Sequence, residues 1–348
     1  MKTLGTYSLI SSLILISSPL IFSNAHAIDG VVCQEHTLSI YQSLPAGNTQ
    51  CRRVLPATLE RSYTLCVPSK LTIAPEPVAL LLAFHGGGDN ANAIAFQNRT
   101  QWEVSGLKNE FIVAYPNGCG TDTLEPGKAR ALICNSGGYN KSWNTQGDIP
   151  RGVPELCGIN DRNFVAQVIL DIQNQYPIKP DRIFAVGHSK GAMMAYSLAC
   201  DLSSNFAAIG VTAGTLTDAT CLPQKPVSIF HVHNLQDPVV PFEGGGIDSD
   251  FSWPSAREGL QFWANKNGCT LTIAQDNPSA PLCTKASCPT GVLLEVCLVD
   301  ESGDTSSGDV AAAHRYDTYD QAFSAFNYNK KKNVYKNIRD AFAERYLE

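Results

Sequence analysis

A short apolar segment, residues 183–187, leads directly into the pentapeptide Gly187-His188-Ser189-Lys190-Gly191, and a helical pattern follows it up to Cys200. This is a G-x-S-x-G pattern at a strand-to-helix junction, where a sharp turn exposes the serine and the glycines avoid collisions with neighbouring elements. A serine hydroxyl is a poor nucleophile until a base takes its proton. The junction predicts Ser189 as a nucleophile, and the alternative is an ordinary glycine-rich turn.

Strand and helix patterns alternate along the rest of the chain. Nearly continuous apolar runs of strand length lie at residues 78–84, 111–115, 183–187 and 227–233. Helical spacing is found in segments 164–172, 191–200 and 258–267, and in a C-terminal stripe of Val334, Ile338, Phe342 and Tyr346. This alternation predicts an α/β fold with a mostly parallel sheet covered by helices. We expect one domain over residues 28–348, with loop insertions at 118–154 and 268–309.

A glycine run, His85-Gly86-Gly87-Gly88, follows the strand predicted at 78–84. Backbone N–H groups in such a loop can hold the negative oxygen of a tetrahedral intermediate, together with the N–H of the residue after the nucleophile. That residue is Lys190. We therefore expect Gly86, Gly87 and Lys190 to form an oxyanion hole, although the sequence does not decide which glycine donates. The alternative is a simple sharp turn.

An acid and a base follow the serine in the chain order Ser, acid, His. The strand predicted at 227–233 leads into Asp237, and His314 is the last histidine after a further strand at 292–298. Ser189, Asp237 and His314 are thus the predicted catalytic triad. The alternatives are a turn aspartate before Pro238 and a loop histidine.

The N-terminus has the pattern of an export signal, in which Lys2 precedes an apolar stretch and Ala25-His26-Ala27 resembles a cleavage site. Residues 1–27 are therefore expected to be a signal peptide, with a retained anchor as the alternative. All 12 cysteines follow residue 27, and this even number without a CxxC pattern predicts disulfides rather than zinc. We expect a secreted or periplasmic protein with no membrane-spanning segment in its mature part.

Charge and spacing argue against several kinds of ligand. The 26 Lys and Arg against 32 Asp and Glu give a net charge of -6, which disfavours nucleic-acid binding. His231 and His233 share one face of a strand without an evident third ligand, so packing is favoured over a metal pair. The acidic loop at residues 300–309 lacks the spacing of an EF-hand. Tyr139 and Trp143 could line an acyl pocket or simply pack.

With these motifs, the sequence resembles secreted α/β-hydrolase esterases of the polyhydroxybutyrate depolymerase type, a group that includes feruloyl and acetylxylan esterases. The resemblance runs from about Tyr63 to Cys269 and is carried by the segments AFHGGG, FIVAYPNG, SWN, CGINDRNF, RIFAVGHSKGAMMAYSLAC, HVHNLQDPVVPFEGG and FWANKNGC. It implies the α/β-hydrolase fold, ester hydrolysis through an acyl-enzyme, and no cofactor. The implied substrates are a polyhydroxyalkanoate oligomer or a hydroxycinnamoyl or acetyl ester.

The resemblance also assigns residues. Ser189, Asp237 and His314 match the triad of these esterases, and His85-Gly86-Gly87 with Lys190 match the oxyanion region. Two cysteines, Cys157 and Cys200, match recurrent family cysteines. The chain departs from the family in having alanines rather than glycines before His314, and lysine where asparagine often follows the nucleophile. A peptidase or lipase on the same fold, or a catalytically silent binding protein, remains the alternative.

Overall fold

The computed structural model describes residues 29–42, 58–88, 92–122, 131–145, 152–246, 252–273, 282–300, 312–315, 342 and 346–347. The predicted signal peptide lies outside the described residues. So does most of the predicted C-terminal helix, of which Phe342 and Tyr346 are described.

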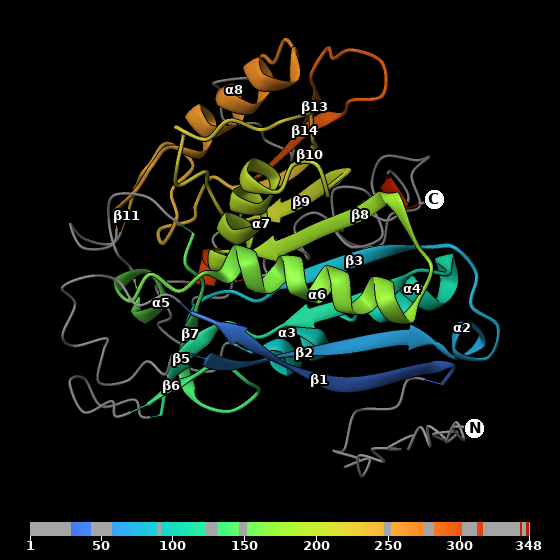
Figure 1. Ribbon diagram of the computed structural model, residues 1–348. Helices are drawn as coiled ribbons and strands as arrows, with labels where there is room; N and C mark the ends of the chain where they lie inside the picture. Colours follow the sequence, from blue (N-terminus) through green and yellow to red (C-terminus); the bar gives the residue numbers. More distant parts are fainter. Residues whose placement is uncertain are drawn as a thin grey trace, which may run out of the picture.

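A central sheet carries the described part of the fold (Figure 1). Its nine strands have the order β1-β2-β4-β3-β8-β9-β10-β14-β13. Their bounds are β1 Val31–Tyr41, β2 Thr58–Pro68, β3 Val78–Phe84, β4 Ile112–Pro116, β8 Ile178–His188, β9 Ala208–Thr212, β10 Ser228–Asn234, β13 Leu282–Lys285 and β14 Leu294–Val299. Neighbouring strands from β4 to β14 are parallel. Antiparallel pairs close both ends of the sheet. The predicted mostly parallel sheet is confirmed.

Burial decides which strands the sequence revealed. β3 and β10 are buried throughout, so their sequences are continuous apolar runs. β1 is an edge strand with mostly exposed or half-buried residues, and it contains no apolar run that would have marked it. β8 begins at Ile178, before its apolar part. Its residues 179–181 are exposed, so the apolar run in the sequence showed only the second half of the strand.

Helices cover both faces of the sheet, as Figure 1 shows for α6 and α7 in front and α3 and α4 behind. The helices are α2 Ser69–Ile73, α3 Ala93–Thr100, α4 Trp102–Asn109, α5 Val153–Leu156, α6 Asp161–Gln175, α7 Lys190–Asp201 and α8 Ala256–Asn267. The side chain of Asn160 caps α6, which ends before Pro177. Ser255 caps α8, and Gly268 ends it in the left-handed conformation.

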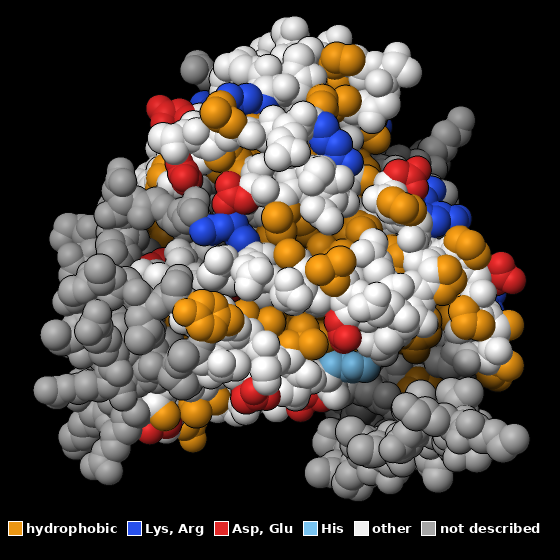
Figure 2. Space-filling model, viewed as in Figure 1, with side chains coloured by type: hydrophobic (Ala, Val, Ile, Leu, Met, Phe, Trp, Pro, Cys, Tyr) orange, Lys and Arg blue, Asp and Glu red, His pale blue; other side chains and the backbone are white. Residues whose placement is uncertain are grey.

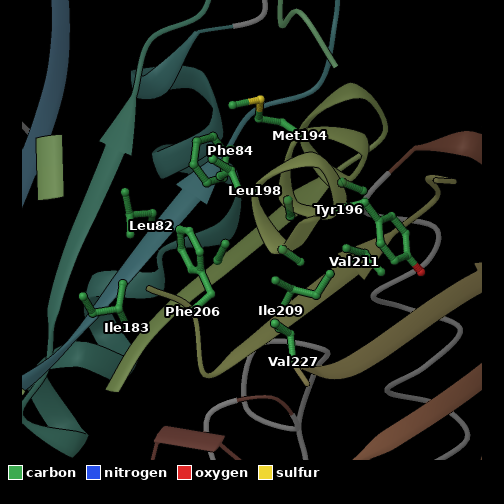
Figure 3. Close-up of a cluster of buried hydrophobic side chains, with 14 of the residues drawn as sticks. Leu82, Phe84, Ile183, Met194, Tyr196, Leu198, Phe206, Ile209, Val211 and Val227 are labelled. Atoms are coloured by element: carbon green, nitrogen blue, oxygen red, sulfur yellow. The ribbon is translucent and has the colours of Figure 1, made fainter. Parts of the chain in front are cut away.

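Alternation along the strands divides the core into two layers. Leu80 and Leu82 of β3 belong to the layer under α6 and α7, whereas Leu81 and Ala83 belong to the opposite one. Figure 3 shows part of the first layer, where the β3 side chains Leu82 and Phe84 lie near Leu198 of α7. Because both faces are apolar and covered, the sheet holds the ends of its strands in fixed positions.

Disulfides attach the peripheral segments to this core. The described pairs are Cys33–Cys66, Cys119–Cys134, Cys200–Cys221, Cys269–Cys288 and Cys283–Cys297. Cys157 is also disulfide-bonded. The last two pairs lie in the insertion that follows α8, and Cys119–Cys134 links two segments of the other insertion. The predicted disulfide-stapled insertions are confirmed.

Short strands give the first insertion its own structure. β5 Cys119–Thr121 lies between β6 Leu132–Ile133 and β7 Tyr139–Ser142 in a three-stranded sheet. A two-stranded ribbon of β11 Gly245–Gly246 and β12 Ser252–Trp253 follows β10. The sequence predicted only a loop insertion at residues 118–154 and made no prediction for residues 245–253, because strands of two to four residues leave no measurable periodicity.

The described surface carries mixed charge. On the face shown in Figure 2, acidic and basic side chains are interspersed among uncharged ones. None of the helices in the described part of the chain combines the length and apolarity that a membrane crossing requires.

Candidate active site

The predicted site residues meet at one end of the sheet. His85 follows β3, Ser189 follows β8 and Asp237 follows β10. His314 ends the short 3-10 helix η1, Ala312–His314, which comes after β14 in the chain. Because β3, β8, β10 and β14 run parallel, their carboxyl ends lie at the same edge, where open α/β sheets bind ligands.

Ser189, His314 and Asp237 form a continuous hydrogen-bonded chain. The Ser189 Oγ lies 2.9 Å from His314 Nε2, and His314 Nδ1 lies 2.7 Å from Asp237 Oδ2. A carboxylate only accepts, so Nδ1 carries the proton and Nε2 accepts from the serine hydroxyl. The Asp237 side chain is fully buried, while 13% of the His314 side chain is exposed. The structure thus brings together the three residues that the sequence singled out, in the order needed to move a proton.

The turn at Ser189 is strained and depends on glycines. Ser189 has φ 54° and ψ -122° at the start of α7. A Cβ on Gly187 would lie 2.2 Å from the Gly191 backbone, and one on Gly191 would lie 2.1 Å from the Phe84 carbonyl oxygen. Only glycine fits at either position, which explains the G-x-S-x-G spacing in steric terms. The strain directs the hydroxyl out of the junction.

Backbone donors hold the carboxylate of Asp237. Its Oδ1 accepts from the N–H groups of Val239 at 2.9 Å and Val240 at 3.0 Å. The Asp237 N–H donates in turn to the Asn234 carbonyl at 3.1 Å. These bonds leave Oδ2 directed at His314, so the loop after β10 orients the acid.

The glycine loop lies against Ser189. A Cβ on Gly86 would lie 3.5 Å from the Ser189 Cβ, and one on Gly87 would lie 3.2 Å from the Lys190 Cγ. The Gly88 N–H donates to the Lys141 carbonyl at 3.1 Å. The Gly88 N–H is therefore already engaged, which is consistent with the prediction that Gly86 and Gly87 are the glycines of an oxyanion hole.

His85 anchors the same loop. Its Nε2 accepts from the Gly118 N–H at 2.9 Å and its Nδ1 donates to the Gly86 carbonyl at 2.6 Å. Burial lowers the pKa of His85 to about 3, so the ring stays neutral and keeps this tautomer. Trp143 is fully buried and its indole N–H donates to the His85 carbonyl at 2.9 Å. Trp143 therefore packs beneath the loop, whereas Tyr139 is 43% exposed on β7.

The side chain of Lys190 contacts polar groups of other segments. It forms an ion pair with Glu155 of α5 and donates to Thr145 Oγ1 at 2.9 Å. Its Nζ also lies 5.4 Å from the centre of the Trp253 ring. Burial raises the pKa of Glu155, and the positive charge of Lys190 opposes that rise. The sequence left this side chain without a role, and the structure shows that it joins α7 to α5.

His231 and His233 belong to a buried chain of hydrogen bonds. His233 Nε2 donates to the Val240 carbonyl at 2.7 Å, His231 Nε2 lies 3.0 Å from His233 Nδ1, and the Tyr196 hydroxyl lies 2.8 Å from His231 Nδ1. Burial lowers the pKa of both rings, which are therefore neutral. Every ring nitrogen of the pair is engaged, so the arrangement fits packing rather than metal binding.

Sequence reasoning missed His188 and Asn234. The His188 ring is buried, its centre lies 5.2 Å from that of His314, and it hydrogen-bonds the His314 backbone. The Asn234 side-chain amide donates to the Ala313 carbonyl at 2.9 Å. Both contacts hold the segment that carries His314. His188 stands at a variable position of its motif and Asn234 at the end of a strand, so neither had a local signal.

A cavity of about 270 Å³ opens beside Ser189. Ser189 and His314 lie on its wall together with the glycine loop. Its described lining consists of His85, Gly86, Gly87, Gly88, Asn92, Ala95, Phe96, Arg99, His188, Ser189, His314 and Arg315. Neither Tyr139 nor Trp143, the predicted pocket residues, is part of this lining.

Comparison with known families adds to this geometry. Residues 73–251, just over half of the chain, match the Phospholipase/Carboxylesterase family. The chain belongs to the phospholipase/carboxylesterase family. This membership confirms the predicted α/β-hydrolase fold, and it confirms the predicted class of enzyme, the ester hydrolases, at the level of the family.

Individual proteins show the range of the similarity. The chain is 27% identical over 256 residues to the bifunctional acetylxylan esterase/xylanase XynS20E of Neocallimastix patriciarum, covering 72% of this chain and 32% of that protein. It is 26% identical over 187 residues to a probable feruloyl esterase C of Aspergillus niger, covering 53% and 58% of the two chains. It matches the solved acetyl xylan esterase from Aspergillus awamori with a TM-score of 0.46 at 14% identity, covering 77% and 93%. The chain thus spans 32% and 58% of the lengths of these two curated relatives.

Proposed function

We propose that this protein is a serine carboxylesterase that hydrolyses carboxylic esters through an acyl-enzyme. The observation that carries the proposal is the chain of hydrogen bonds from Ser189 through His314 to Asp237. The cavity beside Ser189 gives an ester access to it. Membership of the phospholipase/carboxylesterase family supports the same reaction class.

The geometry supports the following sequence of steps. His314 Nε2 takes the proton of Ser189 as Oγ attacks the ester carbonyl, and Asp237 stabilises the imidazolium that forms. The backbone N–H of Lys190 and the loop of Gly86 and Gly87 stabilise the negative oxygen. His314 then protonates the leaving alcohol. Water attacks the acyl-enzyme with the same base, which releases the acid and restores Ser189.

The relatives extend the proposal to the substrate. Proteins named acetylxylan esterase and feruloyl esterase match this chain, which supports an acetyl or hydroxycinnamoyl ester as substrate. A polyhydroxyalkanoate oligomer remains the other expectation from the sequence. Eleven disulfide-bonded cysteines in the described residues, five pairs and Cys157, support export. The proposal includes removal of residues 1–27 and one catalytic domain over residues 28–348.

The test compares wild type with Ser189→Ala on p-nitrophenyl acetate, methyl ferulate and a hydroxybutyrate dimer. Because nucleophile and base act as a unit, Ser189→Ala should lose at least about a thousandfold in kcat, while circular dichroism shows an unchanged fold. A variant that kept a tenth of wild-type activity would refute the role of Ser189. A wild-type protein inactive on every ester and unlabelled by a serine-directed fluorophosphonate would instead be the silent binding protein.

A further inference from the structure

Two cationic side chains lie on the wall of the cavity beside Ser189. Arg99 belongs to the last turn of α3, and Arg315 directly follows the base, His314. No residue of the described lining is an aspartate or a glutamate. Asp237 lies beneath His314, where hydrogen bonds engage both of its oxygens. The described wall of the cavity is therefore cationic, although the whole chain has a net charge of -6.

The charge of Arg99 acts on the wall that carries the nucleophile. Burial is the main cause that lowers the pKa of His188; His314 also lowers it, Asp237 opposes the shift, and the positive charge of Arg99 makes a smaller contribution that lowers it. The His188 ring packs against the His314 ring. Arg99 lines the same cavity as His188, His314 and Ser189, and its exposed side chain keeps access to solvent and ligand.

Guanidinium groups recognise carboxylates in a particular way. Each presents N–H donors in a planar fork that matches the two oxygens of a carboxylate. With five N–H donors, a guanidinium that already has one contact can still donate hydrogen bonds to a carboxylate. A cavity of about 270 Å³ is at the small end of ligand sites, which favours a compact acid over a long chain.

We propose that this cavity binds esters that carry a free carboxylate, held by Arg99 and Arg315 while the ester carbonyl lies at Ser189. The proposal rests on the function proposed above, and among the substrates considered there it favours an oligomer of hydroxy acids over acetyl and hydroxycinnamoyl esters of neutral alcohols. A short oligomer of hydroxy acids ends in a free carboxylate, as does a half-ester of a dicarboxylic acid. An acetyl ester of a neutral alcohol offers no such group.

The experiment compares two esters with the same leaving group, neutral p-nitrophenyl butyrate and anionic p-nitrophenyl hemisuccinate. Wild type, Arg99→Gln, Arg315→Gln and the control Lys179→Gln are assayed in full-length protein. Lys179 is exposed near the start of β8, at the opposite end of that strand from Ser189. Its replacement by glutamine changes the net charge of the protein by as much as each arginine substitution does. The ratio of kcat/KM for the anionic ester to that for the neutral one should fall about tenfold in each arginine variant, through KM. It should stay constant in Lys179→Gln.

Salt should reduce the wild-type ratio, because it screens exposed charges. A ratio that the arginine substitutions leave unchanged, or that Lys179→Gln lowers as much, would overturn the proposal.

A binding measurement separates this proposal from the esterase proposal. Succinate should raise the melting temperature of Ser189→Ala, and the gain should disappear when Arg99→Gln is added. This readout needs no catalysis, so it tests the carboxylate site even if no ester is hydrolysed. Inorganic phosphate serves as the competing anion: stronger stabilisation by phosphate than by succinate would assign the site to a phosphate group and contradict the proposal.

Discussion

The side-chain amide of Asn234 donates a hydrogen bond to the backbone carbonyl of Ala313, 2.9 Å away, across 79 positions of sequence. Asn234 is the last residue of β10, and its own carbonyl accepts the N–H of Asp237. One residue therefore contacts both the loop of the proposed acid and the segment of the proposed base. The strand end sets the distance between Asp237 and His314 through these two bonds.

Asn234→Ala should lower kcat about tenfold or more with little change in KM, because the base loses a bond that holds it in register with the acid. The control is Asn267→Ala. Asn267 is also buried and bonds the Val227 backbone, just before the opposite end of β10. Both variants should lose about 1–3 kcal/mol of unfolding free energy, since each exposes unpaired backbone groups. Steady-state kinetics gives kcat and KM of both variants, and urea unfolding gives their stability. An equal loss of kcat in the two variants would mean that Asn234 has a purely structural role.

Ser189→Ala and His314→Ala should be almost equally inactive, and the double variant should be little worse than either single one. The physical reason is the 2.9 Å bond between Ser189 Oγ and His314 Nε2, through which the two residues perform one proton transfer. Initial rates on p-nitrophenyl acetate measure the effect. Losses that multiply in the double variant would contradict a shared step.

Lys190→Met should destabilise the protein by about 3–5 kcal/mol, because it leaves the buried carboxylate of Glu155 without its cation. Adding Glu155→Gln should recover a large part of that loss, since the remaining side chain is neutral. Urea unfolding of the four proteins gives the coupling free energy between the two positions. Additive losses would show that the ion pair contributes no coupling.

Stability should fall as the pH drops from about 6.5 toward 3, because histidines that are neutral in the folded protein gain protons on unfolding. Burial lowers the pKa of His85 to about 3, and it also lowers the pKa of His188, His231 and His233. In this window the unfolded chain binds more protons than the folded one, so each such histidine removes up to about 1.4 kcal/mol per pH unit.

Urea unfolding between pH 6.5 and 5 checks this prediction, because ordinary carboxylates remain mostly ionised there. His231→Gln should reduce the slope of unfolding free energy against pH by about one proton. A stability that is constant over this interval would show that these rings are already protonated in the folded state.

Removing the Cys283–Cys297 disulfide by a double change to alanine should cost about 3 kcal/mol of unfolding free energy, given its 14-residue separation. The bond also ties β13 to β14, the strand next to β10. The matched variant removes Cys269–Cys288, whose separation of 19 residues predicts a similar loss. Thiol titration of the denatured wild-type protein should find few or no free thiols, and many free thiols would refute the disulfide network.

The sequence alone determined the central strands, the strand-to-helix junction and the order of the candidate triad. β3 and β10 are buried on both faces, so their apolar runs identify them without any knowledge of their neighbours. The turn at Ser189 requires glycines on both sides for local steric reasons, so a motif of five consecutive residues is enough to predict this turn. In a parallel sheet, residues that follow successive strands are brought to one edge whatever the loops between them.

Tertiary structure alone decided the partners of individual side chains. The pairing of the cysteines, the burial of Trp143 under the glycine loop and the ion pair of Lys190 with Glu155 each depend on how distant segments pack. The contact between His314 and Asp237 joins residues 77 positions apart, and that of Asn234 with Ala313 joins residues 79 apart. Periodicity and motif spacing report on a residue's own element and its near neighbours. Contacts across such distances depend instead on the path of the whole chain. For this reason only the tertiary structure shows that Arg99 and Arg315 line the same cavity.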